Sequence, residues 1–457
     1  MSMSVKKHRK LKIFLLALAA VIVVFVAYNA ISGWLDSRPK NDYTHSAHTG
    51  AAAAYPDAKF AVISDLHIYD PSLGTTGAAF EETMYSDRKL LLDSEALLDY
   101  AIEDILQSEA EFVLIPGDVT KDGEVINHKI VAEKLSRLTD AGLGVYLVPG
   151  NHDVNNPDAV AYSGDHTTPV ATVSDAGFAG IYAAFGYGDA LYRDAATLSY
   201  VAEPKAGLWV LALDACRHRE NQPGEGEIVG GRLTQETVDW MAQVLSEAQN
   251  QGNAVMAMMH HGVAEHWDGK AKLHPDYLVE DFRHIGAFLA SYDVRLVYTG
   301  HYHALDITRA DFDSGGYIYD VATGSLITAP CPIRYCSIVD NVFSVESEFI
   351  VDKVYPDDPD FAANATAFVK RTVVLEAYNT LKKYKVSDKD SEYIADAVGD
   401  GFVAHYNGDE VTADKPDFDT SRLGLWGRIV YAIQKYVVDG LWVDLPPGDA
   451  NVSFSLK

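Results

Sequence analysis

The stretch Lys59-Phe60-Ala61-Val62-Ile63-Ser64-Asp65-Leu66-His67 begins as a short apolar run and ends in an aspartate and a histidine two positions apart. Residues 59–63 have the length and apolar character of a buried strand. The polar pair directly after them would lie at the carboxyl end of that strand, where the ligand sites of open α/β sheets gather. We therefore expect Asp65 and His67 to be site residues on a strand end.

The same arrangement occurs four more times along the chain. Apolar runs end at four further polar clusters, which are Gly117-Asp118, Gly150-Asn151-His152-Asp153, His260-His261 and Gly300-His301-Tyr302-His303. In three of the five clusters a glycine stands just before the first polar side chain, where it allows the backbone to turn sharply beside a bound ion. The repetition predicts that several strand ends contribute to one site.

The chemistry of these clusters predicts a metal centre. They offer two carboxylates, one amide and four imidazoles, on Asp65, Asp118, Asn151, His67, His260, His301 and His303. A mixture of oxygen and imidazole ligands suits Mn, Fe, Zn or Co better than Ca or a thiolate-bound metal. The set is too large for one tetrahedral zinc ion. It suits two ions about 3.5–4 Å apart that share one bridging carboxylate.

The order D-x-H, G-D, G-N-H-D, H-H, G-H-x-H resembles the calcineurin-like metallophosphoesterase superfamily over roughly residues 58–350. The resemblance implies a four-layer α-β-β-α sandwich built on two mixed sheets. It also implies a ligand set, with Asp65, His67 and His303 on one cation, Asn151, His260 and His301 on the other, and Asp118 bridging them. A hydroxide held between the two divalent or trivalent cations would be the nucleophile.

Three further residues receive roles from the same resemblance. His152 would face the leaving group as proton donor or positive stabiliser, Asp153 would hold the His152 ring, and His261 would contact the substrate or support the metal ligands from behind. Five loop residues are weaker candidates for substrate contact, because solvated positions fit them better; they are His166, Arg217, His218, Arg219 and His266.

The form of the motifs is similar to the branch that hydrolyses cyclic nucleotides and glycerophosphodiesters. A phosphodiesterase acting on a small phosphoester is therefore the leading hypothesis. A phosphomonoesterase on the same scaffold, a nuclease and a catalytically silent surface-binding protein remain as alternatives.

Periodicity outside the motifs predicts the remaining elements. Helical spacing over 90–110 and 128–141 separates the first three strands, which predicts a parallel β-α-β-α-β unit. We expect residues 69–88 to form a loop over the site and residues 154–205 to form a cap with a short helix near 176–185. Further helices are expected over 234–248, with Thr234 as N-cap, and over 283–291, and further strands over 199–202, 208–213, 317–321 and 342–351.

The chain changes character after Pro356. Helical spacing over 361–384, 388–405 and 421–439 predicts a helical C-terminal domain, 354–457, behind a metallophosphoesterase domain, 58–353. An apolar stripe on its last helix is interpreted as a packing surface rather than a ligand site; it consists of Leu423, Leu425, Trp426, Ile429 and Val430.

The charge composition of the chain argues against one class of function, nucleic-acid binding. Of 457 residues 48% are apolar, and the formal net charge is −28 although residues 1–12 contain five Lys or Arg and no acid. An acidic body repels phosphate backbones, so nucleic acid is not expected as the main partner. Of the three cysteines, Cys331 and Cys336 could form a disulfide or remain thiols.

The N-terminal segment predicts a membrane anchor. Residues 13–35 carry no charge and follow the basic tail 1–12, a length and flank that suit a single span with the catalytic part outside the cytoplasm. The alternative is a cleaved signal peptide, for which Ala27-Tyr28-Asn29-Ala30 is a poor site. Residues 36–57 are expected to be a tether, and the oligomeric state stays open.

Overall fold

The computed structural model of the chain describes residues 39–44, 52–408 and 410–457. They belong to two units, one ending at Tyr43 and one from Thr44 to Lys457. In the first unit the Asn41 side-chain amide donates to the Tyr43 hydroxyl at 3.3 Å. The predicted basic tail and membrane segment lie outside the described residues, as does part of the predicted tether. Within the described ranges, no helix has both the length and the apolar character needed to cross a membrane.

The first sheet of the second unit carries three of the five predicted clusters. Its six strands lie in the order β15-β14-β13-β1-β2-β3. The strands are β1 (Ala58–Val62), β2 (Phe112–Ile115), β3 (Gly144–Leu147), β13 (Pro332–Val339), β14 (Val342–Phe349) and β15 (Asn451–Ser455). Strands β1, β2 and β3 run parallel, as predicted, whereas β13, β14 and β15 are antiparallel additions.

The second sheet carries the other two clusters. Its seven strands lie in the order β11-β12-β10-β9-β8-β7-β6. They are β6 (Tyr192–Arg193), β7 (Tyr200–Lys205), β8 (Leu208–Leu213), β9 (Ala254–Met259), β10 (Leu296–Thr299), β11 (Asp306–Asp311) and β12 (Tyr317–Ala322). Strands β8, β9, β10 and β12 are mutually parallel.

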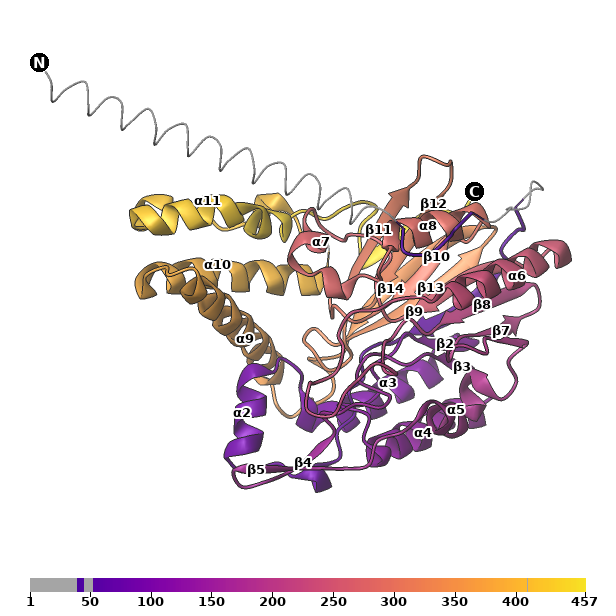
Figure 1. Cartoon of the computed structure of the whole chain (residues 1–457), viewed down its shortest axis with the longest axis horizontal. Helices are drawn as coiled ribbons and strands as arrows, with labels where there is room; N and C mark the ends of the chain where they lie inside the picture. Colours follow the sequence, from indigo (N-terminus) through magenta and orange to yellow (C-terminus); the bar gives the residue numbers. More distant parts are fainter. Residues whose placement is uncertain (1–38, 45–51, 409) are drawn as a thin grey trace, which may run out of the picture. The chain divides into compact units, whose positions relative to one another are not determined.

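The two sheets pack face to face between layers of helices (Figure 1). The Phe60 ring on β1 meets the Tyr298 ring on β10 edge to face, with 5.7 Å between centroids. Helices α3 (Ser94–Gln107) and α4 (Val125–Asp140) lie on the six-stranded side, and α6 (Gln235–Gln251) and α8 (Phe282–Ser291) lie on the other. The mixed α/β fold is thus confirmed, and Thr234 caps α6 by accepting a hydrogen bond from the Thr237 amide, as expected.

The segments between the strands hold several smaller elements. The predicted loop 69–88 contains helix α2 (Ala78–Ser86), which buries only Phe80 and therefore shows little apolar periodicity. The cap contains the hairpin β4 (Val160–Ser163) and β5 (His166–Pro169) and helix α5 (Asp175–Ile181). The remaining short helical segments are α7 (Lys270–Leu273), η1 (Pro71–Leu73), η2 (Leu91–Asp93), η3 (Ala183–Tyr187), η4 (Pro275–Tyr277), η5 (Thr412–Asp414) and η6 (Thr420–Arg422).

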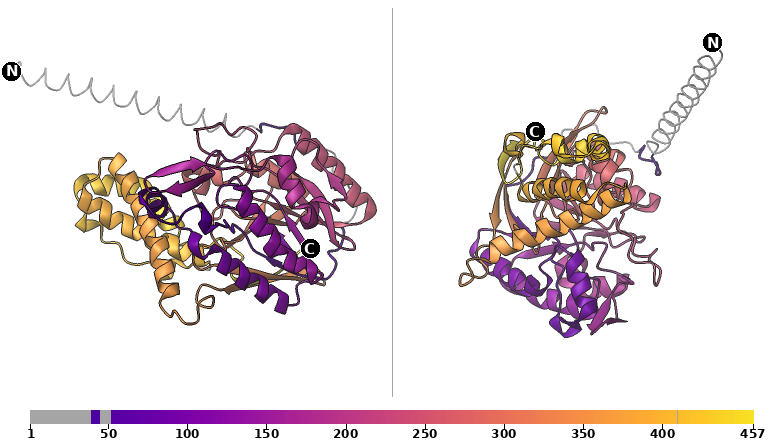
Figure 2. Two further views of the ribbon diagram at one scale, coloured as in Figure 1. Left: turned by 90° about the horizontal axis from the view of Figure 1, so that it is seen from below. Right: turned by 90° about the vertical axis from the view of Figure 1, so that its left-hand side faces the viewer.

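The C-terminal region is helical, as predicted, and gathers at one end of the second unit (Figure 2). It consists of α9 (Phe361–Lys383), α10 (Asp388–Asn407) and α11 (Leu425–Gly440), which share a small apolar core around Ile394 and Val430. Strand β15 then returns the chain to the six-stranded sheet beside β14, which the helical spacing did not predict.

Two expectations for this half of the chain can be compared with the structure. The apolar stripe at α11 is only partly packed, since Leu425, Trp426 and Ile429 are 79%, 52% and 41% exposed. Leu423 and Val430, the other two members of the stripe, are buried. The three cysteines are free thiols.

Candidate metal centre

The five polar clusters converge because they follow five parallel strands of two facing sheets. Asp65 and His67 follow β1, Asp118 follows β2, and Asn151 follows β3 at the end of the six-stranded sheet. His260 follows β9, and His301 and His303 follow β10, in the seven-stranded sheet. All seven predicted ligand residues are buried.

The first predicted cation set is assembled. His67 Nε2 lies 3.2 Å from His303 Nε2. Asp65 Oδ1 lies 3.4 Å from His303 Nε2 and 3.9 Å from His67 Nε2. Two donors on one cation with bonds of about 2.0–2.2 Å are themselves separated by roughly 3.0–3.5 Å. The spacing therefore fits a shared cation after small adjustments.

The second set stands beside the first and is joined to it by Asp118. His260 Nε2 lies 3.1 Å from Asn151 Oδ1 and 3.2 Å from Asp118 Oδ2. His301 brings a ring nitrogen within 4.8 Å of the ligand atoms of Asp118 and His260. Asp118 Oδ2 is also 3.6 Å from His67 Nε2 in the first set. One carboxylate oxygen thus faces both groups, as a bridging ligand must.

The ligand side chains are oriented by neighbours, as metal ligands commonly are. His260 donates from Nδ1 to the Pro116 carbonyl at 2.9 Å, which turns Nε2 toward the centre. The Thr328 hydroxyl lies 3.2 Å from His303 Nδ1, and the Ser64 hydroxyl donates to Asp65 Oδ2 at 2.5 Å. These contacts leave the inward-facing atoms available to a cation, so the residues present fit a binuclear centre.

The backbone of the centre is strained where the ligands are presented. Five of the seven ligand residues have left-handed φ angles between 38° and 69°; they are Asp65, His67, Asp118, His301 and His303. Such angles cost a non-glycine residue about 1–3 kcal/mol and recur at functional sites. Gly117 has φ 105°, and a Cβ there would lie 2.7 Å from His260 Nδ1, so glycine is required for this close approach.

His152 stands at the edge of the centre, close to the predicted metal ligand Asp118 and partly exposed to solvent. Its backbone amide donates to Asp118 Oδ1 at 3.0 Å, and its Nε2 lies 4.0 Å from Asp118 Oδ2. Burial alone would lower the pKa of His152, but Asp118, followed by Asp122 and Glu227, outweighs it and raises the pKa to about 9. Asp122 and Glu227, which are not among the predicted ligands, favour the protonated ring, which suits the predicted role of proton donor.

The residue that holds the His152 ring is Asp122, not the predicted Asp153. His152 Nδ1 lies 2.9 Å from Asp122 Oδ1. The Asp153 carboxylate turns away from the ring and accepts hydrogen bonds from the Val119, Thr120 and Gly150 amides and the Thr120 hydroxyl, at 2.8–3.1 Å. Asp153 therefore ties the second ligand loop to the third, which corrects the role inferred from its place beside His152.

His261 is not at the pocket surface. It is fully buried, donates from Nε2 to the Val229 carbonyl at 2.8 Å and packs its ring 4.5 Å from that of His301. This position corrects the predicted substrate contact and agrees with the alternative, in which His261 supports a ligand, here the His301 ring. The five weaker loop candidates, His166, Arg217, His218, Arg219 and His266, do not line the pocket either.

The centre forms the floor of a pocket of about 280 Å³. Its walls include side chains that the motifs did not indicate: Arg88, Lys89, Glu227, Tyr277 and Glu376. Arg88 Nη1 lies 3.7 Å from Glu376 Oε2 on α9, so the C-terminal region forms part of the wall. Arg88 and Lys89 are the only Lys or Arg residues between Lys59 and Lys121. This isolated basic pair in an acidic sequence is the signal by which the two wall residues could have been found.

Residues 58–305 match the family model described as calcineurin-like phosphoesterase. The chain belongs to this family. The match covers all seven predicted ligands of the phosphoesterase and ends before the C-terminal helices. Family membership supports metal-dependent hydrolysis of phosphoesters and a binuclear centre, whereas the identity of the metals is not established.

Comparison with solved structures returned phosphatases and a nucleotidase at low sequence identity. A dimetal phosphatase from Danio rerio is 16% identical, with a TM-score of 0.45, over 65% of this chain and 96% of that one. A purple acid phosphatase from yellow lupin is 10% identical, with a TM-score of 0.38, over 65% of this chain and 52% of that one. A 5'-nucleotidase precursor from Thermus thermophilus is 12% identical, with a TM-score of 0.36, over 69% of this chain and 59% of that one. The phosphoesterase thus spans little more than half the length of the last two. No curated protein matches its sequence.

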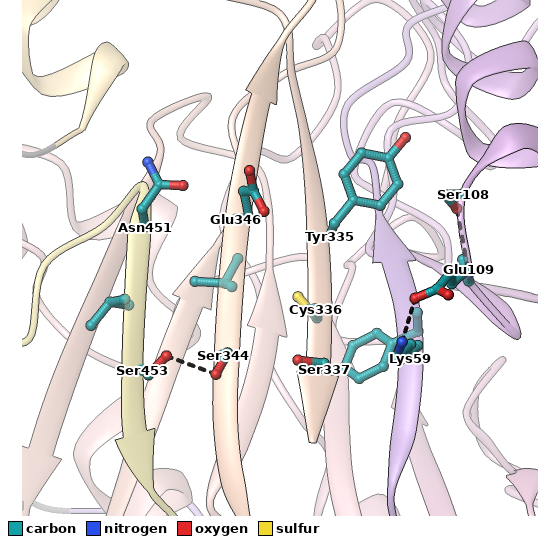
Figure 3. A pocket seen from close by; sticks show the side chains of 14 residues that line it. Lys59, Ser108, Glu109, Tyr335, Cys336, Ser337, Ser344, Glu346, Asn451 and Ser453 are labelled. Carbon is teal, nitrogen blue, oxygen red and sulfur yellow. Dashed lines mark hydrogen bonds and ion pairs between the residues drawn. The ribbon is translucent and has the colours of Figure 1, made fainter. Parts of the chain in front are cut away.

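A larger hollow of about 650 Å³ lies on the six-stranded sheet of the phosphoesterase, away from the metal centre (Figure 3). Its lining residues come from β1, β13, β14, β15 and the end of α3, and include an ion pair between Lys59 and Glu109. None of the five ligand loops reaches it, and its lining contains no histidine or aspartate. The smaller pocket over the ligands is therefore the candidate active site.

Proposed function

We propose that this protein hydrolyses small phosphodiesters, of the cyclic-nucleotide or glycerophosphodiester type, with the help of two transition-metal cations. The observation that carries the proposal is the placement of Asp118 Oδ2 between two ligand sets at the floor of a pocket open to solvent. Two bound cations would generate a water-derived nucleophile at neutral pH and offset charge on the phosphoryl oxygens.

The residues of the chain would divide the remaining work. Lys89 and Arg88 would bind phosphoryl oxygens at the pocket wall, since charge-assisted hydrogen bonds to phosphate are strong. His152, held by Asp122, would protonate the leaving oxygen. Tyr277, whose ring lies 4.5 Å from that of His301, would form an apolar wall beside the ester group.

The charge of the pocket supports a diester over a monoester. Each cation on the wall stands near a carboxylate, Arg88 at 3.7 Å from Glu376 and Lys89 at 3.9 Å from Asp87. Glu227 adds a further acid 3.9 Å from His152. A diester with one negative charge meets less repulsion from these acids than a dianionic monoester does.

The test compares bis(4-nitrophenyl) phosphate with 4-nitrophenyl phosphate as substrates of the full chain reconstituted with Mn, Zn, Fe or Co. We expect a higher kcat/KM for the diester and loss of both activities on chelation. Preference for the monoester would favour a phosphomonoesterase. If the protein binds two metals and hydrolyses neither ester nor a broader phosphoester panel, the catalytically silent binding protein would replace the proposal.

We also propose that residues 13–35 anchor the protein in the cell membrane, with the catalytic unit outside the cytoplasm. The support is the uncharged length of this segment and the basic tail before it. Membrane fractionation with alkaline extraction, combined with protease treatment of intact cells, tests this. Recovery in the soluble cytoplasmic fraction would contradict it, and release of a shortened chain to the medium would indicate a cleaved signal peptide.

A further inference from the structure

A second group of metal-type side chains lies where the C-terminal helices meet the seven-stranded sheet. Asp306 begins β11, His405 lies near the end of α10, and Glu410 follows that helix. One ligand atom from each lies within 4.8 Å of the other two, and all three side chains are at most 1% exposed. None of them takes part in the binuclear centre.

The atoms of this group are spaced as ligands of one cation would be. His405 Nδ1 lies 2.7 Å from Glu410 Oε1 and 3.9 Å from Asp306 Oδ2. Donors around a tetrahedral zinc ion are roughly 3.4 Å apart, so both distances reach that value after shifts of well under 1 Å. His266 lies at the edge of the group, with Nδ1 3.5 Å from Asp306 Oδ1 and Nε2 3.2 Å from Asp320 Oδ2.

Several buried atoms of the group lack a hydrogen-bond partner among the described residues. They are Asp306 Oδ2, Glu410 Oε2, His405 Nε2 and His266 Nδ1. Buried polar atoms are nearly always paired in folded proteins, and leaving a carboxylate oxygen unpaired is costly. Asp306 Oδ2, which lies 3.9 Å from His405 Nδ1, is the unpaired oxygen that a cation held between these two residues would satisfy.

The charge balance of the surroundings indicates that the ligand is a cation. Four buried carboxylates gather here, on Asp306, Asp320, Glu410 and Asp449, against the buried cations Lys270 and Arg334. Burial, followed by the neighbouring acids Asp449 and Glu410, raises the pKa of Asp306 well above its ordinary value. A divalent ion among these carboxylates would offset their mutual repulsion.

We propose that Asp306, His405 and Glu410 bind a third divalent transition-metal ion that fastens the C-terminal helices to the catalytic sheet. An imidazole and carboxylate set of this kind suits zinc or manganese. The ion would act structurally, since no described pocket opens onto these residues.

The proposed third metal site lies behind the loop that carries His301 and His303, with the Tyr302 ring between them. Tyr302, between the predicted ligands His301 and His303, packs its ring 5.8 Å from His405 and 6.4 Å from Phe402 of α10. An ion that holds His405 in place would therefore also support the loop that carries two ligands of the binuclear centre.

The test counts zinc ions per chain by mass spectrometry and follows thermal unfolding after dialysis against a chelator and readdition of Zn²⁺ alone. We expect three equivalents for the natural chain, two for Glu410→Gln and for His405→Gln, and a lower unfolding temperature for both variants. His274→Gln is the matched control, because His274 is a half-buried imidazole that packs against Tyr302 and Phe402 without belonging to the group; it should keep three equivalents.

A His67→Ala/His260→Ala chain separates this inference from the proposed function, because it removes one imidazole from each predicted catalytic cation. This double variant should retain one equivalent of zinc and still show a rise in unfolding temperature when zinc is added. Its result decides the proposal even if the Glu410 and His405 variants fail to fold. Saturation of the natural chain at two equivalents, or no zinc in the double variant, would overturn the third site and leave the proposed function standing.

Discussion

Replacement of His152 by glutamine tests the most specific chemical role in the proposed mechanism. Three carboxylates surround the ring: Asp122 at 2.9 Å from Nδ1, and Glu227 and Asp118 at 3.9 and 4.0 Å from Nε2. Glutamine keeps a polar group of similar reach and leaves the backbone hydrogen bond to Asp118 in place. It has no proton to release at neutral pH, so the substitution removes acid catalysis with little change in shape.

The size of the effect depends on the leaving group. A positioned general acid contributes about 10²–10⁴-fold, which corresponds to about 2.7–5.4 kcal/mol of transition-state stabilisation. We expect a loss near the lower bound, about 100-fold, for an unsubstituted phenyl diester, because one hydrogen bond to Asp122 holds the ring and its side chain is 18% exposed. A 4-nitrophenyl ester needs little protonation on departure, so its loss should stay below about tenfold.

The assay measures kcat for a series of substituted phenyl phosphodiesters of increasing leaving-group basicity. The dependence of log kcat on basicity should be steeper for the variant than for the natural chain. Metal content is measured for both proteins, and His166→Gln, a substitution at an exposed histidine on β5, is the control. An equal loss across the series with both metals retained would refute the acid role and indicate that His152 only positions the phosphoryl group.

Three further outcomes follow from the structure. Asp153→Asn should lower the free energy of unfolding by about 1–3 kcal/mol in urea denaturation, because it leaves buried amides unpaired; unchanged stability would contradict the loop-tying role. Lys89→Met should raise KM about tenfold or more by removing a charge-assisted bond to phosphate, whereas Lys59→Met on the distant hollow should not. Burial lowers the pKa of His128 to about 4, below its ordinary value. Between pH 7 and pH 5 the His128 ring is therefore protonated in the unfolded chain but not in the folded one, and the free energy of unfolding should fall by about 2 kcal/mol. His128→Gln should flatten that decline in urea titrations at the two pH values, and an unchanged slope would exclude His128 as its source.

The convergence of the candidate ligands could be predicted because its signals are local. A strand end followed by an aspartate or histidine specifies both the chemistry and the edge of the sheet, as Asp65 after β1 and His260 after β9 show. Helix α6 was predictable for a similar reason, since Thr234 and the apolar spacing after it act within a few residues. Roles that depend on the family pattern, such as which cation each ligand holds, stay predictions.

Contacts between distant segments could not be predicted in this way. Glu376 reaches the pocket from α9, nearly three hundred residues beyond Arg88, and no periodic pattern connects the two. Strand β15 has only five residues and exists through pairing with β14. Asp153 was misassigned because neighbours in sequence need not face each other, and the turn after β3 directs its carboxylate away from the His152 ring.

The positions of the wall cations depend on a region outside the family match. The Thr372 hydroxyl of α9 donates to the Asp87 carbonyl at 2.8 Å, and Asp87 Oδ1 in turn accepts from the Arg88 and Lys89 amides at 2.7 and 2.9 Å. Glu376, one helical turn after Thr372, pairs with Arg88. The machinery for breaking the phosphoester bond therefore lies within residues 58–305, whereas the surface that would select the ester is set partly by the C-terminal helices. Members of the family that share the ligands but lack such helices should for this reason differ in substrate rather than in reaction.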